Sequence, residues 1–139
     1  MNASTIEYTT SLEHIRESML QGFFVGWPNP PSSSAHLRIL KGSYLVWLAI
    51  DTETNRVVGF INAISDGVLS AYIPLIEVLP AYQNKGIGKE LVGRMLDSLK
   101  HLYMIDLLCD TDLQSYYATF GMHNATGSFT RNFERQNCE

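Results

Sequence analysis

Cysteine is scarce in this sequence, because only Cys109 and Cys138 occur among 139 residues. Their separation matches no metal-ligand spacing, and two cysteines are too few for the disulfide scaffold of a small secreted domain. The sequence also lacks an apolar run of membrane-spanning length, and its first residues, M-N-A-S-T-I-E-Y, contain no basic region followed by an apolar one. We therefore expect a cytoplasmic protein that binds neither a metal nor a membrane.

Basic charge is also in short supply. Ten Lys and Arg residues stand against 14 Asp and Glu residues, which gives a formal net charge of −4. Because nucleic-acid-binding surfaces are basic, we expect no nucleic-acid partner. The hydrophobic content of 45% is typical of a globular protein, and the length suits one compact domain over residues 1–139. The composition leaves both a monomer and a homodimer open.

The order of apolar segments and turn residues predicts a mixed α/β sheet with helices on its faces. Thr10-Ser11-Leu12-Glu13 has the form of a capping box and predicts a helix from residue 10 to about residue 21. Pro74 lies inside an expected strand and cannot donate to a ladder, so it predicts a bulge, an edge or a place where the sheet splays. The expected strands are 6–9, 44–50, 56–65, 71–79, a buried strand at 103–109 and 129–133, and the further expected helices are 32–42, 88–100 and 113–120.

A glycine-containing turn, V-L-P-A-Y-Q-N-K-G-I-G at residues 78–88, joins an apolar strand to an amphipathic helix. Gly86 and Gly88 allow a ligand to approach the backbone, and the helix start offers free N–H groups and the positive end of its dipole. Lys85 and Lys89 add positive charge. The spacing is not that of a P-loop, and Leu91 stands where a dinucleotide-binding fingerprint needs its third glycine. The turn therefore predicts a phosphate site of a different kind.

Two motifs identify a family. Q-x-x-G-x-G at residues 83–88, preceded by V-x-P, resembles the acyl-CoA pyrophosphate loop of the GNAT superfamily of N-acyltransferases, and Y-Y-A-T-F-G-M at residues 116–122 is similar to the family's F-Y-x-x-x-G-F run. The element order agrees over nearly the whole chain. The resemblance, to a small bacterial-type member, implies one GNAT domain with a mixed, mostly antiparallel sheet and about four flanking helices. That sheet is expected to splay between the strand before the loop and the next strand.

The resemblance implies acetyl-CoA as cofactor, with strand backbone groups pairing with the pantetheine and the turn holding the pyrophosphate. Tyr117 aligns with the family tyrosine that points at the cofactor sulfur, and a phenol with a pKa of about 10 is protonated at pH 7 and can act as general acid. Tyr116 is expected to pack on the sheet, and Cys109 to be a buried small hydrophobe rather than an acyl carrier. Asp110 and Leu113 depart from the family's usual Asn and Ala. The expected cofactor-binding residues are Ile76, Val78, Gln83, Asn84, Lys85, Gly86, Ile87, Gly88 and Lys89.

The loop at residues 23–31, F-F-V-G-W-P-N-P-P, either covers the core or forms the wall of an acceptor pocket. The resemblance implies the second role, and its aromatic residues favour a small amine. The expected pocket residues are Phe24, Trp27, Asn29 and Tyr72.

The general base is not evident, since the positions where the family places it are not acidic here. Glu77 and Asp66 are the weak candidates, and simple alternation puts Glu77 on the opposite face from Tyr72 unless a bulge at Pro74 shifts the register. The four histidines, His14, His36, His101 and His123, are expected on the surface or at helix caps.

The function that follows is an acetyl-CoA-dependent N-acetyltransferase that acts on a primary amine of a small molecule by direct attack in a ternary complex. A protein or peptide N-acetyltransferase is one alternative. A non-catalytic acyl-CoA-binding sensor on the same fold is the other, which the missing base permits.

Overall fold

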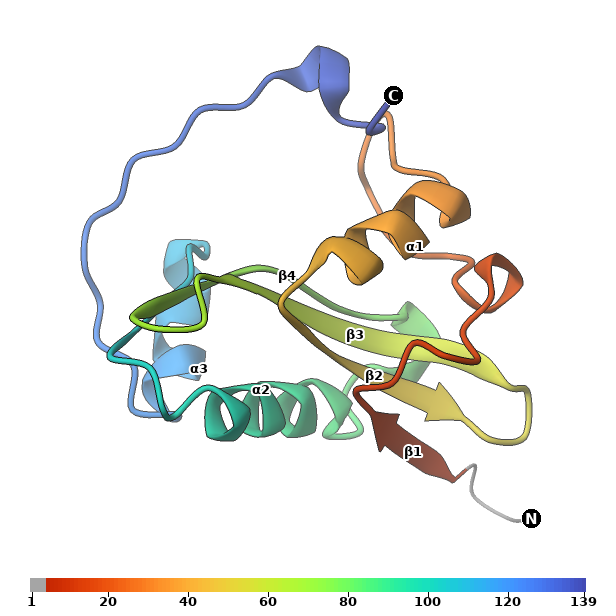
Figure 1. The fold of residues 1–139 in the computed structure, drawn as a ribbon, viewed down its shortest axis with the longest axis horizontal. Coiled ribbons are helices and arrows are strands. Elements are labelled where there is room, and N and C mark those ends of the chain that lie inside the picture. Colours follow the sequence, from red (N-terminus) through yellow and green to blue (C-terminus); the bar gives the residue numbers. More distant parts are fainter. Residues whose placement is uncertain (1–4) are drawn as a thin grey trace.

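The computed structural model describes residues 5–139, and its centre is a five-stranded sheet in the order β1-β2-β3-β4-β5 (Figure 1). Neighbouring strands are antiparallel, except that β4 and β5 run parallel. The strands are β1 Ile6–Thr9, β2 Leu45–Asp51, β3 Arg56–Ser65, β4 Ser70–Val78 and β5 Met104–Asp106, and the α-helices are α1 Ser33–Gly42, α2 Ile87–Ser98 and α3 Gln114–Ala118. The mixed, mostly antiparallel sheet is as predicted. Short 3₁₀ helices lie at Glu17–Met19, Pro80–Tyr82, Thr111–Leu113 and Phe133–Arg135.

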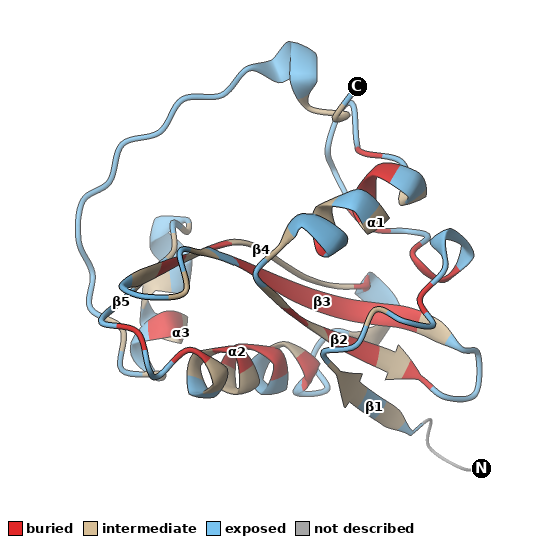
Figure 2. Ribbon diagram, viewed as in Figure 1, coloured by how far each residue is buried: buried red, intermediate tan, exposed pale blue. Residues whose placement is uncertain are grey.

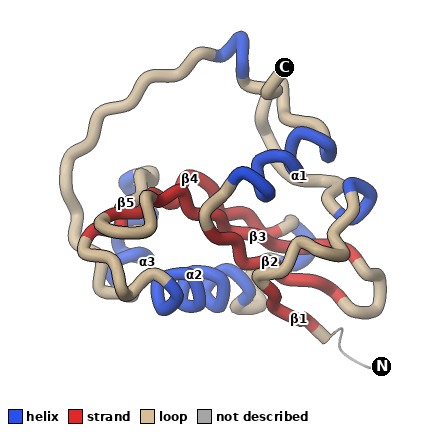
Figure 3. The backbone as a smooth tube through the Cα atoms, in the orientation of Figure 1, coloured by secondary structure: helices blue, strands red, loops and turns tan. Residues whose placement is uncertain are grey.

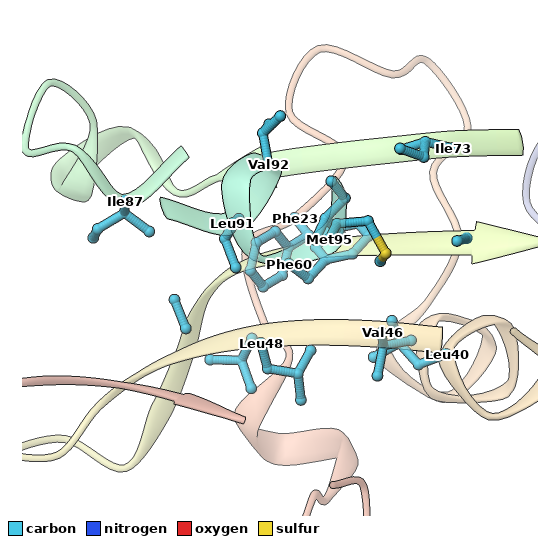
Figure 4. Close-up of a cluster of buried hydrophobic side chains, with 14 of the residues drawn as sticks. Phe23, Leu40, Val46, Leu48, Phe60, Ile73, Ile87, Leu91, Val92 and Met95 are labelled. Atoms are coloured by element: carbon cyan, nitrogen blue, oxygen red, sulfur yellow. The ribbon is translucent and has the colours of Figure 1, made fainter. Parts of the chain in front are cut away.

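The helices α1 and α2 lie on opposite faces of this sheet (Figure 1). Figure 4 shows core side chains from both helices and the sheet, among them Leu40 of α1, Phe60 of β3 and Leu91 of α2. Phe60 on β3 points toward α1, because its ring lies 4.4 Å from the ring of His36. The preceding residue, Gly59, faces α2, where a Cβ would lie 3.1 Å from the Leu91 side chain. The absence of a side chain at Gly59 therefore lets α2 pack closely on the sheet. Burial is greatest along β3 and the inner side of α2 (Figure 2).

A bulge in β4 and the opening of the sheet occur together. Asn62 pairs with Leu75 and Ile64 pairs with Tyr72, so β4 contains one more residue than β3 between these pairs. The extra residue falls at Ile73 and Pro74, because proline cannot complete a regular ladder. Pairing between β4 and β5 ends at Tyr72 and Asp106. The predicted bulge and the predicted splay are both confirmed.

The helix expected from residue 10 to residue 21 is wrong. Hydroxyl oxygens of Thr9 and Ser11 accept the N–H groups of Ser11 (3.0 Å) and Glu13 (3.3 Å), and such local bonds compete with helix formation. Only the 3₁₀ helix Glu17–Met19 forms within this range. Two apolar residues of the expected helix, Ile15 and Met19, are nevertheless buried. Their helical spacing therefore reflects burial in the core and not a helix.

Two strand predictions in the last third of the chain are also wrong. The range 103–109 contains only the three-residue strand β5, none of its residues is fully buried, and Cys109 is half-buried. Residues 129–133 form no strand. Both errors have one cause, because the C-terminal segment does not pack as a further strand beside β5 (Figure 3).

Candidate functional site

The turn between β4 and α2 winds tightly, with left-handed backbone at Asn84 (φ 62°) and Gly86 (φ 84°). Within residues 5–139, the backbone N–H groups from Asn84 to Lys89 donate to no protein acceptor. Glu90 is the first residue of the helix whose N–H is bonded, to the Gly86 carbonyl at 3.1 Å. A row of free N–H groups at a helix N-terminus is a site for phosphate oxygens.

Space lies open in front of this turn. A Cβ added to Gly86 would meet no heavy atom within 4 Å, and one added to Gly88 would lie 3.7 Å from both the Tyr116 hydroxyl and Val78 Cγ2. A methyl group at either position would therefore occupy room that a ligand can use. The Tyr116 hydroxyl bounds this room, which the sequence did not indicate, since packing on the sheet was expected for Tyr116.

The side chains of the turn have separate roles. The Gln83 amide donates to the Val78 carbonyl at 3.0 Å, so it closes the turn onto the end of β4. The Lys85 ammonium lies 5.5 Å from the centre of the Tyr82 ring, and the Tyr82 hydroxyl donates to Asp51 at 2.5 Å. Lys89 is exposed on α2. Two positive charges thus flank the free N–H groups.

The open edge of β4 presents backbone groups beside this turn. The Leu79 N–H donates to the Val58 carbonyl at 2.8 Å, and antiparallel bonding alternates along the strand, so the groups of Glu77 and Leu75 also face β3. The N–H and C=O groups of Ile76 and Val78 therefore face the opposite way. That side is where β5 has diverged, so an extended ligand could pair there.

Tyr117 is 8% exposed on α3, and burial, with smaller contributions from Tyr116 and Cys109, raises the pKa of its phenol. Its hydroxyl makes no hydrogen bond within the described chain, yet it is not one of the fully enclosed polar atoms without a partner. The oxygen therefore has some access to solvent. A raised pKa keeps this group protonated at pH 7, as a proton donor requires.

The residues expected to line the pocket for the acceptor amine lie mainly on one face of the sheet. Phe24 is buried against the rings of His36 and Trp27, each 4.9 Å away, whereas Trp27 is partly exposed. The Asn29 N–H donates to Gln136 Oε1 at 2.9 Å, which ties the loop to the C-terminus. Phe24 thus packs in the core, which confirms that the loop covers the core, and the role of the loop as a wall of the acceptor pocket stays a prediction.

The bulge in β4 brings Glu77 to this face. Glu77 is opposite Phe60 and Tyr72 is opposite Ile64, and Phe60 and Ile64 share a face because they are four residues apart in β3. Glu77 Oε1 accepts the Phe24 N–H at 2.8 Å, and Oε2 accepts the Val25 N–H at 3.3 Å. The carboxylate thereby holds Phe24 in a left-handed conformation with φ 63°.

Asp66 is confined to the turn between β3 and β4. Its Oδ1 accepts the N–H groups of Val68 (2.9 Å), Leu69 (2.9 Å) and Ser70 (3.2 Å). These backbone bonds lower the pKa of Asp66, which makes it a weaker base. Of the two carboxylates, Glu77 is therefore the one whose position suits a role beside the aromatic loop.

His36 is a residue that sequence reasoning placed wrongly, since it is 1% exposed rather than at the surface. It packs against the rings of Phe23, Phe24 and Phe60, and neither ring nitrogen has a hydrogen-bond partner. Burial lowers its pKa to about 4, so the imidazole is neutral at pH 7. The sequence contained one sign of this burial: His36 follows Ala35 on the inner side of α1, within the helix rather than at its cap.

Two negative findings concern residues 5–139. In this range, His, Cys, Asp and Glu side chains form no cluster of three or more that could hold a metal ion. None of the helices in the same range is long and apolar enough to cross a membrane.

Known proteins resemble this chain over most of its length. The family model described as Acetyltransferase (GNAT) family matches residues 12–122. An uncharacterised N-acetyltransferase of Prochlorococcus marinus, ycf52-like, is 31% identical over 131 residues, which cover 86% of this chain and 71% of that protein. The crystal structure of a candidate acetyltransferase from Deinococcus radiodurans R1 superposes with a TM-score of 0.91 at 42% identity, over 95% of this chain and 92% of that one.

A Glycine max protein named histone acetyltransferase TAP1 is 31% identical over 108 residues, which cover 70% of this chain and 46% of that protein. The chain thus spans about half the length of several curated relatives that it matches.

Proposed function

Because the chain belongs to the acetyltransferase (GNAT) family, we propose that it is an N-acetyltransferase that moves the acetyl group of acetyl-CoA to a primary amine of a small molecule. The observation that carries the proposal is the row of free N–H groups from Asn84 to Lys89 beside the diverging edges of β4 and β5. A diphosphate matches the first feature, and an extended amide-containing chain matches the second.

In this proposal the turn of residues 83–89 holds the pyrophosphate. Gly86, Ile87 and Gly88 contribute backbone N–H groups, and Asn84 supplies a further one next to them. Lys85 and Lys89 add the positive charge that the uncharged Gln83 does not supply. The backbone groups of Ile76 and Val78 bond the pantetheine amides, which places the thioester further along β4.

The reaction then needs one proton donor and one proton acceptor. The amine nitrogen attacks the thioester carbonyl carbon, the C–S bond breaks, and the phenol of Tyr117 gives its proton to the departing sulfur. No acyl-enzyme forms, since both substrates are bound together. Glu77 is the better placed acceptor for the amine proton, because a carboxylate keeps free lone pairs while it holds two backbone N–H groups.

The aromatic loop favours a small acceptor. Trp27 is partly exposed, and Tyr72 lies on the same face of the sheet as Glu77. An apolar or aromatic amine could therefore pack against the rings of Trp27 and Tyr72. The Glycine max relative is named a histone acetyltransferase, which supports a peptide substrate as the second candidate. We favour the small amine, because a peptide would need an open groove, whereas this loop packs against the core through the buried Phe24.

Thiol release from acetyl-CoA, measured with a panel of small amines and lysine-containing peptides, tests the acceptor. We expect turnover with at least one small amine that has an aromatic or apolar body, and a lower kcat/KM with every peptide. Preference for a peptide would replace the small-molecule proposal. Binding of acetyl-CoA without turnover on any acceptor would favour the sensor.

Replacing Gly88 with Ala tests the cofactor site separately. The added methyl would make only ordinary contacts with the protein, at 3.7 Å, so the fold should be preserved. The methyl enters the space assigned to the pyrophosphate, so we expect the Kd for acetyl-CoA to rise about tenfold or more, equivalent to about 1.4 kcal/mol. Isothermal titration calorimetry measures this change.

Gly42→Ala is the matched control, because Gly42 is the last residue of α1 on the other face of the sheet (Figure 1) and its Cβ would meet nothing within 4 Å. Both substitutions favour helix to a similar extent. Equal acetyl-CoA affinity in the two variants would show that Gly88 does not face the cofactor.

A further inference from the structure

Tyr82 ties the turn between β4 and α2 to a distant part of the sheet. The turn begins with the 3₁₀ helix Pro80–Tyr82 and continues through left-handed backbone at Asn84 and Gly86. The Tyr82 hydroxyl donates to Asp51 Oδ2 at 2.5 Å, and Asp51 is the last residue of β2. The two residues are 31 positions apart in the sequence, so this bond fixes the start of the turn to the end of β2.

Asp51 is a rigid anchor for this bond. The residue is only 1% exposed, and its Oδ1 accepts the Glu53 N–H at 2.9 Å. Its backbone lies between two strands, because it pairs with Ile6 of β1 and with Arg56 of β3. A buried carboxylate needs hydrogen-bond donors to be stable, and Tyr82 supplies one of them. The hydroxyl of Tyr82 is therefore bonded to a group that moves only with the sheet.

The ring of Tyr82 in turn supports Lys85. The Lys85 ammonium lies 5.5 Å from the ring centre, which is within the range of a cation–π interaction. The hydrogen bond to Asp51, with smaller contributions from burial and from the Asp51 charge, raises the pKa of the Tyr82 phenol, so the phenol stays a donor at neutral pH. Asp51, Tyr82 and Lys85 thus form one connected row that leads from the buried end of β2 to the surface of the turn.

The two lysines beside the free N–H groups are therefore not equivalent. Lys85 rests on the Tyr82 ring, whereas Lys89 is exposed and makes no ion pair or ring contact within residues 5–139. A lysine that binds an anion loses rotamer freedom, and the loss is smaller when the side chain already has a fixed position. In the same range no carboxylate pairs with Lys85, so its charge stays available to a ligand.

We propose that Tyr82 is a positioning residue for the pyrophosphate of acetyl-CoA, because it is anchored on Asp51 and holds Lys85 and the start of the turn in place. This inference rests on the proposed function, since it concerns the same cofactor site. It gives the end of β2, which lies outside the turn, a part in the affinity for the cofactor. Loss of Tyr82 should weaken the contact with the diphosphate and leave the pantetheine contact on β4 unchanged.

Two thioesters separate these contacts. Acetyl-CoA contains the diphosphate, whereas S-acetylpantetheine ends before it and can bond only to the edge of β4. Calorimetry gives the Kd of acetyl-CoA directly and the Kd of S-acetylpantetheine by displacement. In Tyr82→Phe we expect the first Kd to rise about tenfold and the second to change less than about twofold. Tyr103→Phe, which removes a hydroxyl from a residue that is 85% exposed, should change neither Kd.

A second pair of variants guards against a loss of stability. Removing the Tyr82 hydroxyl leaves the buried Asp51 with one partner fewer, whereas Tyr82→Phe combined with Asp51→Asn replaces the buried charge by a neutral amide. This double variant should show the same selective rise in the Kd of acetyl-CoA. A partly unfolded protein would instead bind less ligand per chain without a change in selectivity.

A double-mutant cycle tests the link to Lys85. Lys85→Met should raise the Kd of acetyl-CoA less in a Tyr82→Leu background than in the unsubstituted protein, because Lys85 there has already lost its support. Equal rises in the two backgrounds, equal rises for both thioesters, or an unchanged Kd of acetyl-CoA in the Tyr82 variants would each overturn the proposal and leave the cofactor assignment standing. If the unsubstituted protein bound no acetyl-CoA, the proposed function would fail together with this inference.

Discussion

Replacing Tyr117 with Phe is expected to lower the kcat of acetyl transfer by a factor on the order of ten to a thousand. The substitution removes the oxygen that would protonate the leaving thiolate and keeps the ring that packs in the core. Because the hydroxyl has no hydrogen-bond partner in the described chain, its loss should cost little stability. Steady-state thiol release with the best amine of the panel measures the effect, and calorimetry should show unchanged acetyl-CoA binding.

Tyr116→Phe is the matched control, since it removes one oxygen from the neighbouring residue of the same helix. The Tyr116 hydroxyl lies near Gly88, so its loss should alter the KM for acetyl-CoA more than kcat. The two variants therefore separate proton donation from cofactor contact. An unchanged kcat in Tyr117→Phe, or a larger loss of kcat in Tyr116→Phe, would remove Tyr117 as the acid.

Local patterns predicted most of the fold. Four of the expected strands and three of the expected helices form, with ends displaced by at most two residues. The strands were expected at 6–9, 44–50, 56–65 and 71–79, and the helices at 32–42, 88–100 and 113–120. These segments combine apolar periodicity with clear end signals, as at Ser32, whose side chain accepts the Ala35 N–H at 3.1 Å. Pro74 predicted the bulge because its missing N–H constrains the ladder wherever the strand lies.

The errors arose where distant parts of the chain decide local structure. Ile15 and Met19 have helical spacing, yet hydroxyl bonds at Thr9 and Ser11 direct the backbone elsewhere. The range 103–109 is apolar enough for a buried strand, but nothing in its own sequence shows that the C-terminal residues 123–132 form no strand to pair with it. The face of the sheet on which Glu77 lies depends on the size of the bulge in β4, and simple alternation of side chains along the strand could not predict that size.

His36 makes the stability of the fold depend on pH. The pKa of its imidazole is about 4 in the folded protein, against 6.5 in the unfolded chain, because burial disfavours the charged form. Between these pH values the unfolded state binds the proton and the folded state does not. The free energy of unfolding should therefore fall as the pH is lowered from about 6.5 to about 4, by up to about 3 kcal/mol from this group.

The substitution His36→Leu isolates that contribution. Leu has a similar volume and leaves no unpaired nitrogen among Phe23, Phe24 and Phe60, so at pH 7 the variant should be at least as stable as the unsubstituted protein. As the pH falls to about 4, its advantage should grow by about 3 kcal/mol, since other groups titrate equally in both proteins. Urea unfolding monitored by circular dichroism at several pH values measures the difference. His14→Gln, which removes an exposed imidazole, controls for the loss of a histidine as such. If the unsubstituted protein and His36→Leu lose stability in parallel, His36 accepts a proton inside the fold, and the loop above it must open to admit water.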